Sequence, residues 1–322
     1  MIRRPPRSTL SSSSAASDVY KRQAYEIEIT QETVFLRGSS PVGIFYGIQT
    51  LRQLIERDRN HLPCGLIRDW PDLPVRMIML DLARQMEHPD YIRRVIDFCA
   101  RYKLNALHLH LTDDENSCLY HEDYPWLMHP HALQADQVQA LVTYARQYYI
   151  DVIPEIESLG HSKMFIRHPQ AGDILHQSKA KSLHAIPGYT NVLCPASSLT
   201  TKYLDAMYER CSELFPSDSI HIGCDEVNLA GCARCEAKWP DVSAGDQFLQ
   251  HLHRCIEMAE KYGKKTALWN DMFWRGWRGT NLNIDIDNIV KDIPPSSVVI
   301  YDWHYSKIPV DITSKFKTLD YD

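Results

Sequence analysis

The sequence predicts an α/β protein built on a (β/α)8 TIM barrel, with the remainder of a small α+β domain before it. Two observations predict the barrel: strand and helix patterns alternate after Pro74, and nearly every strand pattern ends in acidic, basic or aromatic side chains. An open doubly wound sheet keeps its site at one switch point, next to a glycine-rich phosphate turn that this chain lacks. Side chains that converge from all strand ends are typical of a barrel.

Hydrophobic periodicity places the barrel elements. The strands are short apolar runs and each helix has one apolar stripe; the helix at 89–103 also begins with a proline, which suits a first turn. Six strands are expected, at 77–82, 106–111, 151–154, 219–223, 265–269 and 297–303, with further helices at 136–149, 200–214 and 246–262. The sequence stops before a further strand, so we expect a barrel truncated after its sixth strand, in a chain that is unstable or inactive as written.

Two segments precede the catalytic barrel domain, which we place at 74–322. Residues 1–23 are basic and rich in serine, with no apolar run, so we interpret them as a disordered, non-native leader that replaces the true N-terminus. Residues 24–73 form the partial α+β domain, which ends in the proline-containing linker at 69–74. Its expected elements are strands at 25–29 and 33–37 and a helix at 43–55.

Composition excludes several classes of partner. The 322 residues carry a net charge of −6 and no long run of lysine or arginine, which argues against a nucleic-acid partner. The apolar runs are far shorter than the ~20 residues that cross a membrane, so no membrane partner is expected. The 9 cysteines are odd in number and scattered, which favours reduced thiols and leans weakly toward a cytoplasmic protein, while localisation and oligomeric state stay open.

One cysteine pair has the spacing of metal ligands, Cys232-x-x-Cys235, with Cys224 upstream as a conceivable third ligand. A structural zinc needs four ligands, and the sequence offers no evident fourth. Ordinary loop cysteines are the favoured interpretation, so we assign no metal and no cofactor.

The stretch at 219–228, S-I-H-I-G-C-D-E-V-N, ends an apolar run with two adjacent acids, Asp225 and Glu226. A strand that is buried on both faces cannot hold charge in its interior, so the acids must lie where the chain leaves the sheet. Proteins of the α/β class carry their chemistry at that end. Capping of a following helix is the alternative interpretation for such a pair standing alone.

The acid pair belongs to a series of four motifs: L-D-L-A-R at 80–84, H-L-H-L-T-D-D at 108–114, V-I-P-E-I-E-S-L-G-H-S at 152–162 and H-I-G-C-D-E-V at 221–227. In order and in strand placement, this series resembles the motifs of glycoside hydrolase family 20, the β-N-acetylhexosaminidases. The resemblance extends over about residues 24–305, because the N-terminal segment also resembles the end of the small domain that precedes that family's barrel.

The resemblance implies an exo-acting enzyme that removes terminal β-linked N-acetylglucosamine or N-acetylgalactosamine from a glycan or chito-oligosaccharide. Hydrolysis would be retaining and substrate-assisted, because the sugar's own 2-acetamido oxygen attacks the anomeric carbon to give an oxazolinium intermediate. By its match to the motif, Glu226 would be the general acid and later the base, and Asp225 would orient the acetamido group. Glu226 must then be protonated at rest, and the neighbouring carboxylate raises its pKa.

Five further positions match substrate-binding residues of the family. Arg84 would grip sugar hydroxyls, with an ion pair at the barrel mouth as the alternative. Asp113 and His161 would support the acid/base carboxylate, although a histidine in such a place is equally often a hydrogen-bonded core residue. Trp269 and Trp303 would form aromatic walls around the sugar and its acetamido methyl, with ordinary core packing as the alternative.

Departures from the family pattern concern substrate preference more than reaction type. Cys224 stands where the family commonly has a second glycine, the segment 115–118 replaces a frequent Q-G-W-R, and Gln-Met at 85–86 replaces His-Phe. Trp274 and Trp277 could line a further subsite, but we assign them no role. The choice between the two N-acetylhexosamines is not encoded in these motifs.

Other classes of function stay open beside the hydrolase. A non-catalytic carbohydrate-binding relative would not need adjacent acids, and an inactive fragment would lack the family residues on later strands. A metal-dependent barrel hydrolase would use His108 and His110, which lie two apart on one strand and so point the same way. The same H-L-H-L-T-D-D run occurs in the hexosaminidase motif, so the metal interpretation is the weakest.

Overall fold

In the computed structural model, the backbone contacts divide the chain into two compact units. The first takes in the described residues up to Ile78 together with 94–106 and 145–150, and the second takes in 79–93, 107–144 and the described residues from 151 on. The structure describes residues 22–59, 61–177, 191–273, 281–284, 286–305 and 310–321. The leader that we interpret as non-native therefore lies almost entirely outside the described residues.

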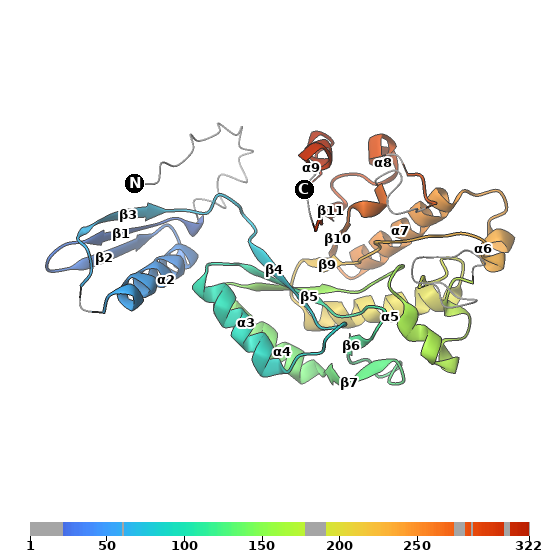
Figure 1. Ribbon diagram of the computed structural model, residues 1–322, viewed down its shortest axis with the longest axis horizontal. Coiled ribbons are helices and arrows are strands. Elements are labelled where there is room, and N and C mark those ends of the chain that lie inside the picture. The colour runs from blue at the N-terminus through green and yellow to red at the C-terminus, as the bar shows by residue number, and fades with distance from the viewer. Residues whose placement is uncertain are drawn as a thin grey trace. The chain divides into compact units, whose positions relative to one another are not determined.

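The first unit is a three-stranded antiparallel sheet with one helix across it. The order is β2 (Val34–Gly38), β1 (Tyr25–Ile29), β3 (Gly65–Asp69), and α2 (Pro41–Arg57) covers one face (Figure 1). Ser40 begins the helix by accepting hydrogen bonds from two backbone N–H groups of its first turn, and a proline follows it. The two expected strands and the helix are confirmed, whereas β3 was not predicted.

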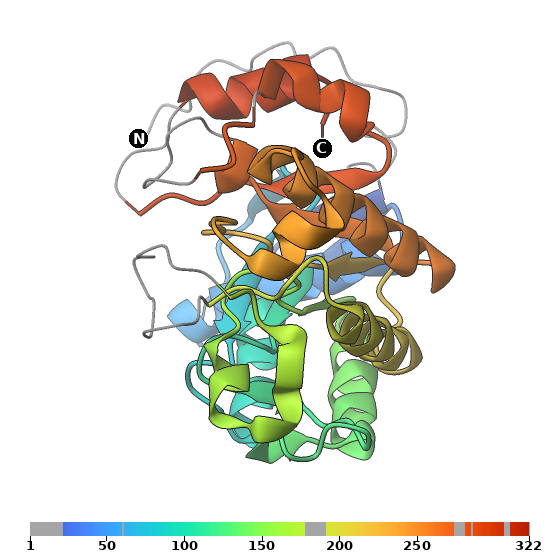
Figure 2. The same cartoon turned by 90° about the vertical axis from the view of Figure 1, so that its right-hand side faces the viewer.

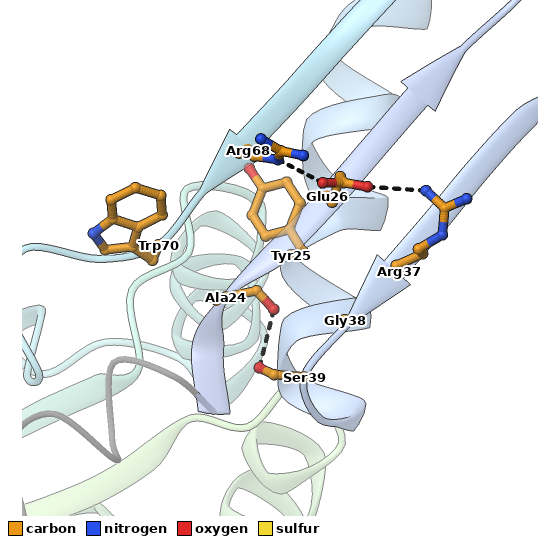
Figure 3. A pocket seen from close by; sticks show the side chains of 8 residues that line it. All are labelled: Ala24, Tyr25, Glu26, Arg37, Gly38, Ser39, Arg68 and Trp70. Atoms are coloured by element: carbon orange, nitrogen blue, oxygen red, sulfur yellow. Dashed lines mark hydrogen bonds and ion pairs between the residues drawn. The ribbon is translucent and has the colours of Figure 1, made fainter.

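Buried and partly exposed side chains alternate along β1, and the buried ones pack this sheet against α2. The side chains of Tyr25, Ile27 and Ile29 are buried with Tyr46 of α2, while the residues between them are partly exposed. The other face carries a shallow cavity of about 340 Å³ beside Glu26, which binds Arg68 at 2.6 Å and Arg37 at 2.9 Å (Figure 3). None of the predicted site residues lines this cavity.

The larger sheet has six strands in the order β11-β10-β9-β8-β5-β4. Neighbours in this sheet are successive strands of the repeating pattern, and β8 through β11 pair in parallel. An open doubly wound sheet would reverse its order at a switch point, so the arrangement is that of part of a (β/α) barrel with a small domain before it. All six expected strands are confirmed: β4 (Met77–Asp81), β5 (Ala106–His110), β8 (Asp151–Glu155), β9 (Ser219–His221), β10 (Lys265–Trp269) and β11 (Val298–Tyr301).

Helices connect these strands, and the four that were expected are confirmed within a few residues. Figure 2 shows α4, α5, α7 and α8 following one another in chain order along the sheet, from green to red. The helices are α3 (Pro89–Arg101), α4 (Ala135–Arg146), α5 (Ser198–Leu214), α6 (Ala233–Lys238), α7 (Ala244–Lys261), α8 (Ile286–Asp292) and α9 (Val310–Thr318). Among the described residues, no helix combines the length and apolar character that a membrane crossing requires.

Short elements in the loops after the strands were not predicted. They are the paired strands β6 (Ser117–Leu119) and β7 (Met128–Leu133) and the 3-10 turns η1 (Lys163–Arg167), η2 (Pro169–Ile174) and η3 (Asp271–Phe273). These elements give the strand-end loops defined backbone positions, from which the polar side chains of the next section project.

Candidate active site

One cavity of about 490 Å³ lies at the carboxyl ends of the strands in the second unit. All seven residues predicted from the sequence line it, although they come from the carboxyl ends of six different strands or the loops after them. They are Arg84, Asp113, His161, Asp225, Glu226, Trp269 and Trp303, joined by Met79, Asp114, Glu115, Lys163, His304 and Tyr305. The structure thus brings every candidate into one space, while the individual roles remain predictions.

The acid pair stands on an unusual stretch of backbone. After β9, Gly223, Cys224 and Glu226 all have positive φ, at 63°, 70° and 50°. Such angles are rare for residues other than glycine and occur often at functional sites, where the surroundings hold the strain. Gly223 is required for a second reason, because a Cβ there would lie 2.1 Å from a carboxylate oxygen of the buried Glu157. The sequence Gly-Cys-Asp-Glu therefore forms a tight turn that presents its acids to the cavity.

His161 lies between three carboxylates. Its Nδ1 is 3.4 Å from Asp113, and its Nε2 is 3.5 Å from both Asp225 and Glu226. Burial lowers the pKa of His161, but the charge of Asp225 and the contacts to the other two acids outweigh burial and hold the pKa well above its usual value. The imidazolium therefore offsets the negative charge that the acid pair brings into the site.

Two more buried acids support this arrangement. The backbone N–H of Glu226 donates to Asp271 Oδ2 at 3.0 Å, and the N–H of Cys224 donates to Glu157 Oε2 at 3.3 Å. Burial raises the pKa of Asp271 and of Glu157 well above the usual range, and the charge of Asp225 adds to the effect. Both carboxyls accept backbone hydrogen bonds that fix the turn on which the acid pair stands.

Arg84 makes the ion pairs that were the alternative to sugar binding. Its guanidinium lies 2.7 Å from Asp81 and 2.7 Å from Asp113, and its side chain is about half exposed in the cavity. Burial lowers the pKa of Arg84, but the charge of Asp113 and the hydrogen bond to Asp81 outweigh burial and raise it. A guanidinium carries five donors, so these pairs leave donors for a ligand, and contact with a sugar stays a prediction.

Asp113 also faces a histidine below the cavity. His110 Nε2 lies 2.8 Å from its Oδ2, and this bond together with the one from His161 outweighs burial and holds the pKa of Asp113 well below its usual value. Asp113 is therefore an ionised carboxylate shared by His110, His161 and Arg84. It connects the open cavity with the buried layer beneath it.

The floor of the site is a fully buried carboxylate, Glu155. Its oxygens lie 2.5 Å from His110 Nδ1, 3.0 Å from His108 Nε2, 2.9 Å from His221 Nδ1 and 2.8 Å from Trp269 Nε1. Burial raises the pKa of Glu155, but the charge of His110 and the other ring contacts hold it well below the usual range. Trp269 is thus both a wall of the cavity and a donor to the charge below it.

The structure gives His108 and His110 a partner other than a metal. Both side chains reach the same carboxylate, so they do point the same way, as their spacing predicts. The charge of this carboxylate is offset by the imidazoles around it, and such pairing is how buried charge is accommodated. Ligand atoms of His108, Glu155 and His221 also lie within 4.8 Å of one another, so the absence of a metal here stays a prediction.

Of the tryptophans considered for sugar binding, the structure describes Trp269 and Trp303. Trp303 lines the cavity with its ring 5.1 Å from that of Tyr305, whose side chain is 89% exposed. Contact with a sugar remains a prediction for Trp303 and for Trp269. Trp274 and Trp277 lie outside the described residues.

Sequence reasoning noted some site residues without a role for them. Glu155, Glu157 and Asp271 are visible as acids at strand ends, but only the fold shows that the first lies beneath the cavity and that the other two hold the turn of the acid pair. Cys224, conceivable as a ligand beside Cys232 and Cys235, instead donates its thiol to a backbone carbonyl of its own turn.

Two family models match the chain. The model described as "Glycosyl hydrolase family 20, catalytic domain" matches residues 74–314, and "Glycosyl hydrolase family 20, domain 2" matches residues 3–70. The second match includes part of the stretch that we interpret as a leader, and the domain boundaries remain predictions.

Curated relatives include β-hexosaminidases from several bacteria. A β-hexosaminidase of Vibrio furnissii is 30% identical over 279 residues, which cover 77% of this chain and 46% of that protein. A β-hexosaminidase of Porphyromonas gingivalis is 26% identical over 329 residues, which cover 90% of this chain and 42% of that protein. The chain therefore spans about half the length of the curated relatives it matches.

Solved structures share the fold. A family 20 exo β-N-acetylglucosaminidase from Vibrio harveyi, in complex with N-acetylglucosamine, matches with a TM-score of 0.74 at 24% identity, over 93% of this chain and 49% of that one. A β-N-acetylhexosaminidase from Bacteroides fragilis matches with a TM-score of 0.72 at 24% identity, over 93% and 59%. Since the catalytic-domain match also covers most of the sequence, the chain belongs to glycosyl hydrolase family 20.

Proposed function

We propose that this chain carries the active site of an exo-acting β-N-acetylhexosaminidase, which removes terminal β-linked N-acetylglucosamine or N-acetylgalactosamine from a glycan or chito-oligosaccharide. Family membership and the name of the curated relatives support the hydrolase class. The observation that carries the proposal is the pair Asp225 and Glu226 in one cavity, with His161 within 3.5 Å of both. We place the catalytic domain from residue 74 on and the small domain at 24–73.

In the first step the acetamido oxygen of the bound sugar attacks its own anomeric carbon. The bond between that carbon and the leaving oxygen breaks while Glu226 donates a proton to the oxygen, which leaves as an alcohol. Asp225 accepts a hydrogen bond from the acetamido N–H, where positive charge develops as the oxazolinium ring closes. No enzyme nucleophile is needed, so neither acid has to reach the anomeric carbon.

In the second step Glu226, now a carboxylate, takes a proton from water as the water oxygen attacks the anomeric carbon. The oxazolinium ring opens, the acetamido group is restored, and the sugar leaves with its original anomeric configuration. The general acid is thereby protonated again for the next cycle. Two attacks from opposite faces give net retention.

The surrounding residues position the two acids. His161 offsets the charge of the pair and is held in place by the ionised Asp113, and Asp271 fixes the backbone of Glu226. Arg84 would donate to sugar hydroxyls while its pairs with acids hold the guanidinium in place. The rings of the two tryptophans would exclude water from the apolar face of the sugar.

The first test is turnover of an aryl β-N-acetylglucosaminide and of its galacto isomer. Replacing the acid, Glu226→Gln, should lower kcat by at least ~10²-fold, because general acid catalysis contributes about 10² to 10⁴. The matched control is Glu209→Gln on the exposed face of α5, which should leave kcat unchanged. Binding of the sugar without turnover by the unmodified protein would favour a non-catalytic binding protein instead.

The second test concerns the substrate's part in the reaction. A 2-trifluoroacetamido substrate has a less nucleophilic carbonyl oxygen, so its kcat should fall steeply while its KM changes little. A thiazoline analogue of the bicyclic intermediate should bind more tightly than N-acetylglucosamine. Equal rates for the acetamido and trifluoroacetamido substrates would contradict participation of the acetamido group.

A further inference from the structure

Four metal-ligand side chains gather in the second unit without lining the cavity of the acid pair. They are fully or almost fully buried: His176, Cys194, Cys232 and Cys235. Cys194 Sγ lies 3.9 Å from Cys232 Sγ and 3.7 Å from Cys235 Sγ. The ligand atoms of the histidine and of the Cys232–Cys235 pair also lie within 4.8 Å of one another.

Backbone pairing holds the first two of these residues side by side. The N–H of His176 donates to the carbonyl of Val192 at 2.8 Å, and the N–H of Cys194 donates to the carbonyl of Ile174 at 2.7 Å. An isolated antiparallel bridge joins the same two segments. The imidazole and the thiol therefore come from two strand-like segments whose register is fixed.

Helix α6 supplies the other two side chains. Cys232 is the residue before the helix and Cys235 lies in its first turn. Arg234 ties this turn to the segment of the histidine, because its guanidinium donates to the carbonyl of Asp173 at 2.6 Å and lies 2.8 Å from the carboxylate of the same residue. The helix is thus anchored against the other ligand segment by contacts that do not involve the thiols.

The spacing of the sulfurs suits one ion. Ligands about 2.3 Å from a tetrahedral zinc place their sulfurs about 3.8 Å apart, whereas a disulfide joins sulfurs at about 2.05 Å. The observed 3.7 and 3.9 Å agree with the first value, and a thiol is too weak a hydrogen-bonding group to account for such a cluster. We propose that His176, Cys194, Cys232 and Cys235 bind one structural Zn²⁺.

Zinc is the metal that this donor set favours. Three thiolates and an imidazole form a common closed structural site, in which no position stays open for water or substrate. Ligand atoms this close to one another surround a single ion and leave no space for an iron–sulfur cluster. Three thiolates leave the site with one negative charge, and the guanidinium of Arg234, which contacts Cys194, offsets it.

The position of this zinc gives it a role in the fold of the site. Its histidine ligand follows the loop that carries His161 after β8, and its Cys232–Cys235 pair follows the loop that carries Asp225 and Glu226 after β9. The ion therefore fastens the far ends of two loops whose near ends are fixed by the sheet. This inference does not depend on the proposed hydrolase activity.

The test is the metal content and coordination of the full 322-residue chain expressed with zinc in the medium. Elemental analysis should give about one zinc per chain, and X-ray absorption should show about three sulfur neighbours near 2.3 Å and one nitrogen near 2.0 Å. Exchange with Co²⁺ should produce cobalt–thiolate charge-transfer and tetrahedral d–d bands. Cys194→Ser should lose these bands, whereas Cys64→Ser, at an exposed cysteine in the first unit, should keep them.

Several results would overturn the proposal. One is a metal-free chain whose nine thiols all react with a thiol reagent after unfolding, and another is a disulfide among the three cysteines found by mass spectrometry without reduction. An absorption spectrum with only oxygen and nitrogen neighbours would also exclude this site. Because the absorption measurement uses the unmodified chain, it decides the question even where the serine variant does not fold.

Discussion

We predict that one added methyl group at Gly160 moves the acid pair and lowers activity while the protein keeps its fold. A Cβ at Gly160 would lie 2.3 Å from the backbone oxygen of Asp225, and no other atom comes within 3.4 Å of it. Real Cβ atoms keep at least 3.0 Å from such an oxygen, so in Gly160→Ala the two segments must separate by about 0.7 Å, from 2.3 to 3.0 Å. The oxygen is part of the backbone, so no side-chain rotation relieves the contact.

The displaced segment carries the acid pair. Since a misplacement of about 1 Å can lower a rate by ~10²-fold, kcat of Gly160→Ala on an aryl β-N-acetylglucosaminide should fall by roughly 30-fold to 100-fold, about 2–3 kcal/mol of transition-state stabilisation. KM should change less, because most of the cavity wall is untouched. The control is Gly65→Ala in β3, where an added Cβ meets nothing within 4 Å.

Circular dichroism and thermal unfolding would show whether both variants keep their fold. Retention of kcat within threefold of the unmodified protein by Gly160→Ala would refute the reasoning. It would mean either that the loops separate without moving the acids or that the acids do not carry the reaction. A parallel loss of rate in Gly65→Ala would show that the measured effect is not specific to the site.

Three further predictions concern two charged residues of the cavity and the turn that carries the acid pair. Because the pKa of His161 is raised in the folded state, the protonated ring stabilises the fold fully below the unfolded pKa of about 6.5. This contribution is lost as pH rises through the pKa of the folded state. The Tm difference between the unmodified protein and His161→Asn should therefore be largest near pH 6 and shrink in alkaline buffer. Asp113→Asn leaves buried cations without their carboxylate and should lower the free energy of unfolding in urea by about 3 kcal/mol at pH 7. The control is Asp72→Asn, at an exposed position. A loss of stability that persists unchanged as pH falls well below 4 would contradict a charge effect. Gly223→Ala combines a positive φ with a Cβ placed 2.1 Å from Glu157, so it should destabilise more than Gly65→Ala, and equal Tm values for the two would contradict the account of this turn.

The barrel elements could be predicted because each buried strand is visible in the sequence as a short apolar run. The run before Asp225 and Glu226, for example, shows both where the strand ends and that its end is polar. By contrast the place of β3 beside β1 is set by pairing with a strand far away in the sequence, which no local pattern shows. Tertiary context therefore decided the elements that periodicity missed.

The site residues likewise divide into those that local motifs predict and those that only the fold brings together. The sequence predicted seven of the thirteen residues that line the cavity, since each of the seven lies next to a recognisable strand end. The floor could not be predicted, because Glu155 meets His110 and Trp269 only when three separate strands lie in their places in the sheet. The sulfur cluster is a further example: Cys232 and Cys235 are visible as a pair, but the other two ligands depend on a backbone pairing that no local spacing encodes.

If the proposed function holds, the bond from Trp269 to Glu155 limits how the sugar specificity of this protein can change. Widening the pocket for a bulkier sugar by shortening Trp269 would also take a donor from an anion that has no access to solvent. Phenylalanine would keep most of the wall and still lose that donor. The shape of the cavity wall and the hydrogen bonding of Glu155 therefore depend on the same side chain. A variant that accepts a wider range of sugars would have to supply a new hydrogen bond to Glu155 in place of the one from Trp269.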